Sequence, residues 1–297
     1  MEKVLQAQGV TKVYGKKEAL KGVDISFRPN CIYGLIGRNG AGKTTLLGCL
    51  TGQARPTSGQ ITYGGQPVWE NERALGEICF SRELSQMLFL GQNTYKVKDY
   101  LRAAKIYYPH WNEFYAQTLV EQFGLDCKKK IRSLSKGMLS MVTIVIAMAS
   151  NAPITILDEP VAGLDIIARE QFYKVLLEDY QKTGRTFIVS THILDEASPI
   201  FEEVVFLNDG KILESGNTEE LIAQFHYVMG TQQEIDSVLR ELKVKAISQE
   251  MLGKSKGVVV RCSAEQLLSL QEKYDITVSG MNLQKVFVAL TDDRQGR

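Results

Sequence analysis

Short apolar runs alternate with longer stretches of mixed polarity along the chain, and they set the first expectations about its fold. Ile32 to Ile36, Ile154 to Leu157 and Phe187 to Val189 are apolar at nearly every position, which is typical of strands that are buried on both faces. Because helical stretches separate these runs, the pattern predicts an α/β core with a mainly parallel sheet. Near the N-terminus, Val4 to Val13 and Val23 to Phe27 alternate between apolar and polar residues and predict an antiparallel β layer.

Two further regions complete a first predicted domain, residues 1–225. The chain from Val97 to Ser150 has helical periodicity and little strand signal, so we expect a helical subdomain, about residues 85–150, inserted into the core. Lys211 to Gly216 predicts a last strand and turn. A helix is expected from Thr218, where Thr218 and Glu219 supply capping chemistry.

The rest of the chain, residues 226–297, alternates between helical and extended patterns and predicts a small α+β domain. The expected helices are 235–242, 264–274 and 283–290, and the expected extended segments are 244–248, 258–261 and 276–278. A domain of this size buries little apolar area by itself. We therefore expect it to pack against the first domain or against the same domain of a second copy.

Composition excludes several classes of protein. The 35 Lys and Arg residues against 34 Asp and Glu give a net charge of +1, so no global field favours nucleic acid as a partner. The basic run Lys128 to Lys130 is interpreted as a solvated turn. The longest apolar stretch, Val142 to Ala149, is far shorter than the roughly 20 residues that span a bilayer. The five cysteines have no metal-ligand spacing, which fits a reducing cytoplasm.

A glycine-rich segment follows the first buried run and opens a helix, which is the context of a P-loop. In such a loop the backbone N–H groups surround the phosphates of ATP and the helix N-terminus adds its positive end. Lys43 is predicted to reach the β- and γ-phosphates and Thr44 to hold Mg²⁺. The residues predicted to bind the nucleotide here are Asn39, Gly40, Ala41, Gly42, Lys43, Thr44 and Thr45.

Two adjacent carboxylates, Asp158 and Glu159, end the second buried run. Ligands bind at the carboxyl ends of parallel strands, so Asp158 is expected beside Mg²⁺ and Glu159 is the natural general base for the attacking water. The alternative interpretation is a helix start before Pro160. The P-loop earlier in the chain makes the catalytic interpretation the stronger one.

Leu134 to Met138 precedes a helix and forms a second anion-binding helix N-terminus with Ser135 and Gly137. One ATP does not need both anion sites from the same chain. A second copy facing the first head to tail would use Ser135 and Gly137 on the γ-phosphate held by its partner. The alternative is that Ser135 is a simple N-cap.

Together these segments resemble the ATP-binding cassettes of ABC transporters over residues 1–225. Leu134 to Met138 is similar to the LSGGQ signature and lies 24 positions before Asp158. The resemblance implies a P-loop ATPase that binds ATP and Mg²⁺. It also implies a dimer around two nucleotides that drives a transmembrane permease subunit at the cytoplasmic face of the membrane.

The resemblance adds three site residues. Tyr14 matches the aromatic residue that stacks on adenine, Asp165 belongs to the loop that crosses the dimer interface, and His192 matches the switch histidine that senses the γ-phosphate. Within the signature, Lys136 and Met138 depart from the consensus Gly and Gln. That leaves the phosphate contacts to Ser135 and Gly137.

A second departure concerns the glutamine that follows the strand near Ile78 in the family. Glu83 occupies the matching place here, and Gln86 follows three residues later. Glu83 is our first choice for ligating the metal or orienting water, and Gln86 is the alternative.

The end of the chain bears on the substrate. Leu283 to Thr291 resembles the tail of bacterial exporter ATPases for drugs, bacteriocins and amphipathic peptides such as phenol-soluble modulins, which favours an exporter of a peptide or antimicrobial. A soluble ABC protein acting on ribosomes or DNA is less consistent, because this chain has one cassette and no heptads. A regulator that binds nucleotide without hydrolysis conflicts with Glu159 and His192.

Overall fold

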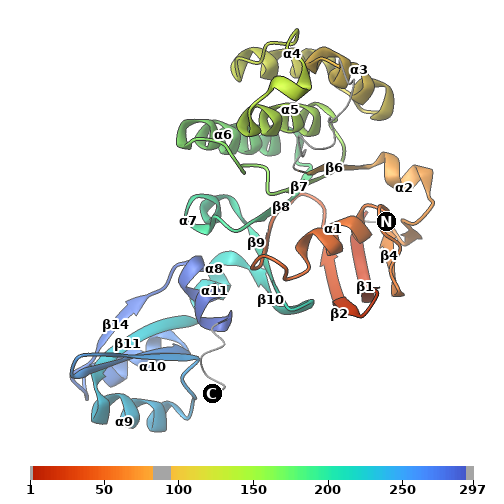
Figure 1. Cartoon of the computed structure of the whole chain (residues 1–297). Coiled ribbons are helices and arrows are strands. Elements are labelled where there is room, and N and C mark those ends of the chain that lie inside the picture. The colour runs from red at the N-terminus through yellow and green to blue at the C-terminus, as the bar shows by residue number, and fades with distance from the viewer. Residues whose placement is uncertain (1–2, 83–94, 292–297) are drawn as a thin grey trace. The chain divides into compact units, whose positions relative to one another are not determined.

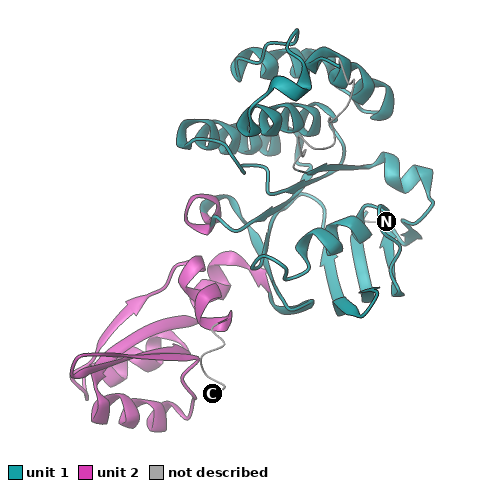
Figure 2. Ribbon diagram, viewed as in Figure 1, with its two compact units in different colours: residues 1–193, 199–214 teal, residues 194–198, 215–297 magenta. Residues whose placement is uncertain are grey.

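The computed structural model describes residues 3–82 and 95–291. Contacts within the chain group it into two compact units, shown in Figure 2. The first unit comprises residues 1–193 and 199–214, and the second, the C-terminal unit, comprises residues 194–198 and 215–297. Among the described helices, none is both long and apolar enough to cross a bilayer.

A six-stranded sheet forms the centre of the first unit (Figure 1), in the order β10-β9-β3-β8-β7-β6. Every residue of β3, β7 and β8 is buried, and the pairs β9-β3, β3-β8, β8-β7 and β7-β6 are parallel. The predicted α/β core is therefore confirmed. The strands are β3 (Ile32–Ile36), β6 (Ile78–Arg82), β7 (Ile154–Asp158), β8 (Thr186–Thr191), β9 (Glu203–Asn208) and β10 (Lys211–Asn217).

The N-terminal part of the chain forms an antiparallel sheet in the order β2-β1-β4-β5, as the alternating pattern predicts. It consists of β1 (Leu5–Tyr14), β2 (Lys17–Phe27), β4 (Ser58–Tyr63) and β5 (Gln66–Pro67). Its apolar face shares one hydrophobic core with helix α1 (Lys43–Leu50) and the larger sheet, through residues such as Phe27, Leu46 and Ile188. This core fixes the position of α1, the helix that follows the glycine-rich loop.

From residue 97 on, helices occupy most of the region expected to be a helical subdomain. They are α3 (Val97–Tyr107), α4 (Glu113–Gln122), a 3₁₀ turn (Ile131–Ser133) and α5 (Lys136–Ala149). The first unit also contains α2 (Glu72–Gly76) before β6 and α6 (Ile166–Thr183) between β7 and β8. Nine of the residues of α5 are buried, so this helix is the centre of the subdomain. Burial of the helix body also fixes the position of its N-terminus.

A buried ion pair joins the helices to the sheet. The Arg185 guanidinium, just before β8, pairs with the Asp179 carboxylate of α6, and the two side chains are 4% and 2% exposed. The same guanidinium donates to the carbonyl oxygen of Met148 at 2.9 Å. Thr183 donates to Asp179 at 3.1 Å, and burial together with Asp179 raises the pKa of Tyr115 on α4. One charged pair thus connects α5, α6 and the start of β8.

The C-terminal unit follows the order β-α-β-β-α-β, with an antiparallel sheet ordered β12-β13-β11-β14. Helices α9 and α10 supply the apolar residues that pack on one face of this sheet, on Val228, Val258 and Val260. Helix α11 contacts α7 and α8. The elements are α7 (Leu194–Ala197), α8 (Thr218–Ile222), β11 (Phe225–Thr231), α9 (Gln232–Leu242), β12 (Ser248–Leu252), β13 (Ser255–Arg261), α10 (Ala264–Gln271), β14 (Thr277–Gly280) and α11 (Leu283–Thr291).

Several local expectations for this part of the chain are wrong. The N-cap of α8 is Asn217, whose Oδ1 accepts from the backbone N–H groups of Glu219 and Glu220, because an Asn side chain one residue earlier reaches both orphan donors. The extended segment expected at 244–248 becomes a strand only from Ser248, and α10 ends at Gln271. The boundary expected at residue 225 stays a prediction, while the contacts within the chain group it with a division near residue 214. The separate role of the C-terminal domain stays a prediction.

Candidate nucleotide-binding site

The glycine-rich loop between β3 and α1 requires glycine at two of its positions. A Cβ on Gly37 would lie 2.5 Å from the carbonyl oxygen of Leu207, and one on Gly42, at φ +108°, would lie 2.7 Å from the carbonyl oxygen of Ala19. Gly42 is also the N-cap of α1, so the backbone N–H groups that open the helix have no side chain over them. Asn39 and Gly40 in the loop are exposed, Ala41 is buried, and Thr45 is half-buried in α1.

Lys43 is buried, although it is a lysine, because two oxygens surround its ammonium. Its Nζ donates to the carbonyl oxygen of Gly37 at 2.7 Å and lies 3.4 Å from Oε1 of Glu159. Only 6% of the residue is exposed. The charge is therefore fixed between the loop and the end of β7, where it can contact terminal phosphates.

Thr44 and Asp158 meet directly: Oγ1 of Thr44 donates to Oδ2 of Asp158 at 2.8 Å. Ser190 of β8 donates to the other carboxylate oxygen. A hydroxyl and a carboxylate are the hard oxygen ligands that Mg²⁺ prefers. Within residues 3–82 and 95–291, no three His, Cys, Asp or Glu side chains gather to hold a metal. A magnesium ion here would therefore need phosphate and water oxygens as well, which is how it binds in nucleotide sites.

Glu159 lies between two groups that can carry positive charge. Its Oε2 accepts a hydrogen bond from Nδ1 of His192 at 2.7 Å, while Oε1 faces Lys43. Its backbone has φ +52°, and its N–H donates to the carbonyl and hydroxyl oxygens of Ser190. A left-handed conformation is costly for a residue with a Cβ, and strain of this kind gathers at functional sites. The side chain is 20% exposed and His192 is 54% exposed, so solvent reaches both.

Ser190 is the member of this cluster that sequence reasoning did not assign. The signal was available, because Asp158 and Ser190 are register partners in the parallel pair β7-β8. Side chains at paired positions of neighbouring strands lie on the same face of the sheet. The Ser hydroxyl orients the Asp158 carboxylate and anchors the turn at Glu159.

Ser135 and Gly137 belong to a second cluster. Ser135 is the N-cap of α5 and its Oγ accepts from the N–H of Met138 at 3.2 Å. A Cβ on Gly137 would lie 2.6 Å from the carbonyl oxygen of Gly163, and Ser140 donates to the carbonyl oxygen of Ala162 at 2.7 Å. The signature segment 134–138 therefore packs tightly on the loop 161–165 of the same chain.

Asp165 ends that loop as the N-cap of α6, where Oδ1 accepts from the N–H of Ala168 at 2.9 Å. Tyr14 ends β1 with 51% of its surface exposed, and the ammonium of Lys12 lies 4.9 Å from its ring centroid. The ring is thus accessible to solvent, and the Lys12 ammonium lies over one of its faces. Hydrogen bonds and ion pairs between side chains bring together Lys43, Thr44, Asp158, Glu159, Ser190 and His192. The roles of Tyr14, Ser135, Gly137 and Asp165 stay predictions.

Glu83 and Gln86 lie outside the described residues, which stop at Arg82, the register partner of Asp158 at the end of β6. We predict that Glu83→Ala raises the Mg²⁺ concentration needed for half-maximal hydrolysis, because a carboxylate next to this edge can ligate the metal. Gln86→Ala is expected to have a smaller effect. Magnesium titrations of phosphate release from the two variants check the order, and the opposite order would assign the role to Gln86.

A glycine-rich loop between a parallel strand and a helix, with a lysine and an acidic strand end beside it, defines a P-loop nucleotide-binding protein. Comparison with known proteins is more specific. A family model described as ABC transporter matches residues 20–162. The lantibiotic transport ATP-binding protein SrtF of Streptococcus pyogenes is 31% identical over 228 residues, which cover 73% of this chain and 95% of SrtF. The chain therefore belongs to the ABC transporter ATP-binding family.

The share of each relative's length that this chain matches differs widely among the other relatives. The ATP-binding protein YtrB of Bacillus subtilis is 24% identical to this chain. The alignment covers 96% of this chain and 97% of YtrB. By contrast, the chain spans 61% of the methionine import protein MetN of Protochlamydia amoebophila and 8% of the mouse glucosylceramide transporter ABCA12. Among solved structures, an ATP-binding subunit of an ABC transporter has a TM-score of 0.64 at 23% identity, over 90% of this chain and 99% of that one. That likeness shows the same fold.

Proposed function

We propose that this chain hydrolyses MgATP as one of two ATP-binding subunits and thereby drives a separate transmembrane permease subunit that exports a peptide or another antimicrobial. The observation that supports ATP hydrolysis by this chain is the position of Glu159. Its carboxylate is held between Lys43 and His192, next to the Thr44–Asp158 pair. A binding site without catalysis does not need a partly exposed carboxylate at that point.

Each residue of the cluster has a proposed step. Glu159 takes the proton of the water that attacks the γ-phosphorus, and His192 holds the other oxygen of Glu159 in place. Lys43 contacts the transferred phosphoryl group, and its charge stabilises the oxygens that gain negative charge. Thr44 and Asp158 would hold Mg²⁺, which supplies further neutralisation of the phosphates when bound. ADP is the leaving group.

The proposed dimer is supported by the second anion site. Ser135 and Gly137 stand at the N-terminus of α5, and their segment packs on loop 161–165. A second chain, arranged head to tail, would place this N-terminus against the nucleotide of the first. A solved cassette with the same fold was captured as a dimer with ADP and phosphate. The partner is either a second copy or a similar ATP-binding subunit.

The proposal of export rests on two relatives. SrtF is named for lantibiotic transport, and BcrA of Bacillus licheniformis, 31% identical over 72% of this chain, is named for bacitracin transport. Both names point to peptide antimicrobials. The chain would then act at the cytoplasmic face of the membrane, held there through its permease. Isolation of the membrane protein that co-purifies with this chain, followed by transport assays in vesicles, tests the assignment.

A mixing experiment tests the head-to-tail dimer. We expect Ser135→Glu to lower ATP turnover about tenfold or more, because a carboxylate at this helix N-terminus repels the partner's γ-phosphate. The affinity of the isolated chain for ATP should stay unchanged. Ser133→Glu, two residues earlier and also exposed, is the matched control and should keep its turnover.

Mixing Ser135→Glu with the inactive variant Lys43→Ala should restore part of the activity. One composite site then combines the intact P-loop of the first chain with the intact signature of the second. The test compares the rate of phosphate release from each variant alone with the rate from the mixture. Full turnover by Ser135→Glu alone would exclude the signature segment from the site.

A further inference from the structure

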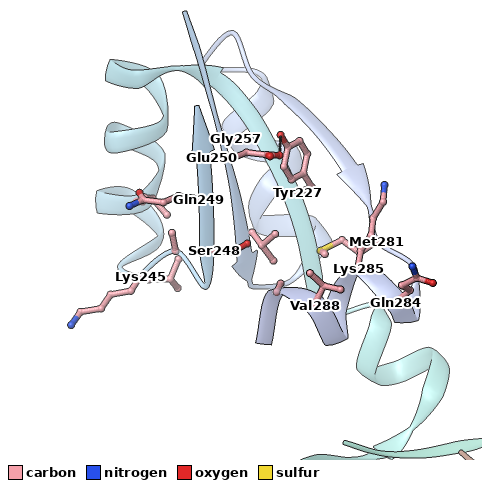
Figure 3. Close-up of a pocket in the computed structure, with 15 residues that line it drawn as sticks. Tyr227, Lys245, Ser248, Gln249, Glu250, Gly257, Met281, Gln284, Lys285 and Val288 are labelled. Carbon is pink, nitrogen blue, oxygen red and sulfur yellow. Dashed lines mark hydrogen bonds between the residues drawn. The ribbon is translucent and has the colours of Figure 1, made fainter. Parts of the chain in front are cut away.

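The C-terminal unit has an open pocket that contains none of the residues assigned to the nucleotide. The pocket has a volume of about 1000 Å³ and lies beside strands β12, β13 and β11 and helix α11 (Figure 3). Alternate residues of a strand point to opposite faces. Because Val228 and Val258 pack into the core with α9 and α10, their neighbours Tyr227 and Val259 face the other side. Tyr227 and Val259 therefore line the pocket from the sheet face that those two helices leave open, and Leu239 of α9 also lines it.

The floor of the pocket is closely packed. Tyr227 and Val259 are register partners across β11 and β13, and a Cβ on Gly257 would lie only 2.0 Å from the Tyr227 hydroxyl. Glycine at 257 thus makes room for the phenol. The hydroxyl donates to Oε1 of Glu250 at 2.9 Å, and burial and this carboxylate raise the pKa of Tyr227. The acidic side chain of the pocket is therefore already engaged within the unit.

The walls combine apolar surface with positive charge. Val288 and Ala289 of α11 and Ala246 before β12 line the space, and Val288 is 47% exposed. An apolar side chain that is half exposed inside a pocket gains stability when a ligand covers it. The wall thus offers contact to an apolar group of a ligand.

Two lysines, Lys245 and Lys285, also line the pocket. Figure 3 shows them on opposite sides, and the Lys245 ammonium points away from the other labelled side chains. Within residues 3–82 and 95–291, neither ammonium has a hydrogen-bond or ion-pair partner. Two other lysines of this unit are paired: Lys256 with Asp236 and Lys273 with Glu241. The lining thus has two lysines against one carboxylate, Glu250, and so a net positive charge. Lysine stems are long enough to turn the two ammonium groups toward a ligand.

We propose that this pocket binds a single-chain anionic amphiphile, with its acidic group at Lys245 or Lys285 and its apolar chain over Val259, Val288 and Ala246. The volume suits a molecule of this class, since small-molecule sites occupy roughly 300–1,000 Å³. A cationic amphiphile would gain the same apolar contacts but would meet a lining of net positive charge. Charge complementarity therefore decides between the two.

Binding of dodecanoate to the full-length chain, measured by calorimetry well below micelle-forming concentrations, tests the proposal. We expect one site per chain, and a dissociation constant about tenfold larger for the double variant Lys245→Ala/Lys285→Ala, since each charge pair contributes modestly. Lys254→Ala, an exposed lysine of the same unit outside the pocket, is the matched control and should bind like the parent. Dodecyltrimethylammonium should bind at least tenfold more weakly than dodecanoate.

A second pair of variants tests the location without removing a lysine. Val288→Asp should weaken dodecanoate binding, whereas Leu268→Asp on the exposed face of α10, where Leu268 is 62% exposed, should not. Equal binding of the cationic and anionic amphiphiles, or unchanged binding by the lysine double variant, would overturn the proposal. Displacement of dodecanoate by a lower concentration of an acidic peptide of alternating Glu and Val would also overturn it, because the occupant would then be a peptide.

Discussion

Replacement of Glu159 by Gln is expected to leave ATP binding intact and to lower kcat by at least about 10²-fold, the usual size of a general-base loss. Gln keeps the shape of the side chain, so the contacts to His192 and Lys43 keep one oxygen acceptor. It cannot take a proton from water. The chain should therefore hold ATP without cleaving it, and the trapped nucleotide should favour the dimer.

Phosphate release, nucleotide binding and light scattering measure the three parts of this result. Glu170→Gln, an exposed residue of α6, makes the same chemical change outside the cluster and should retain parental turnover. If Glu159→Gln hydrolyses ATP at the parental rate, Glu159 is not the base.

Replacement of Arg185 by Leu should cost about 3–5 kcal/mol of the free energy of unfolding, since it leaves the Asp179 carboxylate buried without its partner. Both side chains are almost fully buried, and the carbonyl of Met148 also loses a donor. Folding of the helical subdomain onto the sheet depends on this pair. Urea unfolding monitored by circular dichroism measures this change in the free energy of unfolding.

Two comparison variants separate charge burial from packing. The double variant Arg185→Leu/Asp179→Leu should recover most of the loss, because replacing a buried ion pair by apolar residues is often neutral. Lys182→Leu breaks the pair with Glu178 on the same helix, where the side chains are 74% and 48% exposed. Exposed pairs contribute about 0–1 kcal/mol. If Arg185→Leu is no more destabilising than Lys182→Leu, the buried pair does not hold the subdomain.

The strands of the core and the glycine-rich loop could be predicted because their signals are local. Ile154 to Leu157 is apolar at almost every position, and the buried parallel strand β7 requires such a run. Gly37 and Gly42 stand where a Cβ would strike another backbone segment, so their sequence spacing already reflects the geometry. A short segment contains all of this information.

Features that depend on residues far apart in the chain were not predictable in the same way. Arg185 and Asp179 are charged and would ordinarily be placed at the surface, and only the positions of α5 and α6 make them a buried pair. Strand β11 is central in its sheet, yet His226 and Gly230 give it a mixed pattern that carries no strand signal. The contact between Lys43 and Glu159 likewise needs the parallel register of β3, β8 and β7.

The short helix α7 has a consequence for control of the site. It begins two residues after His192, yet its contacts group it with the C-terminal unit, where it packs on α11. Two peptide units therefore join the histidine to a helix whose position depends on α11. Linkage between sites is reciprocal. If a molecule bound at α11 alters the affinity for nucleotide through this short connection, nucleotide binding alters the affinity for that molecule by the same factor.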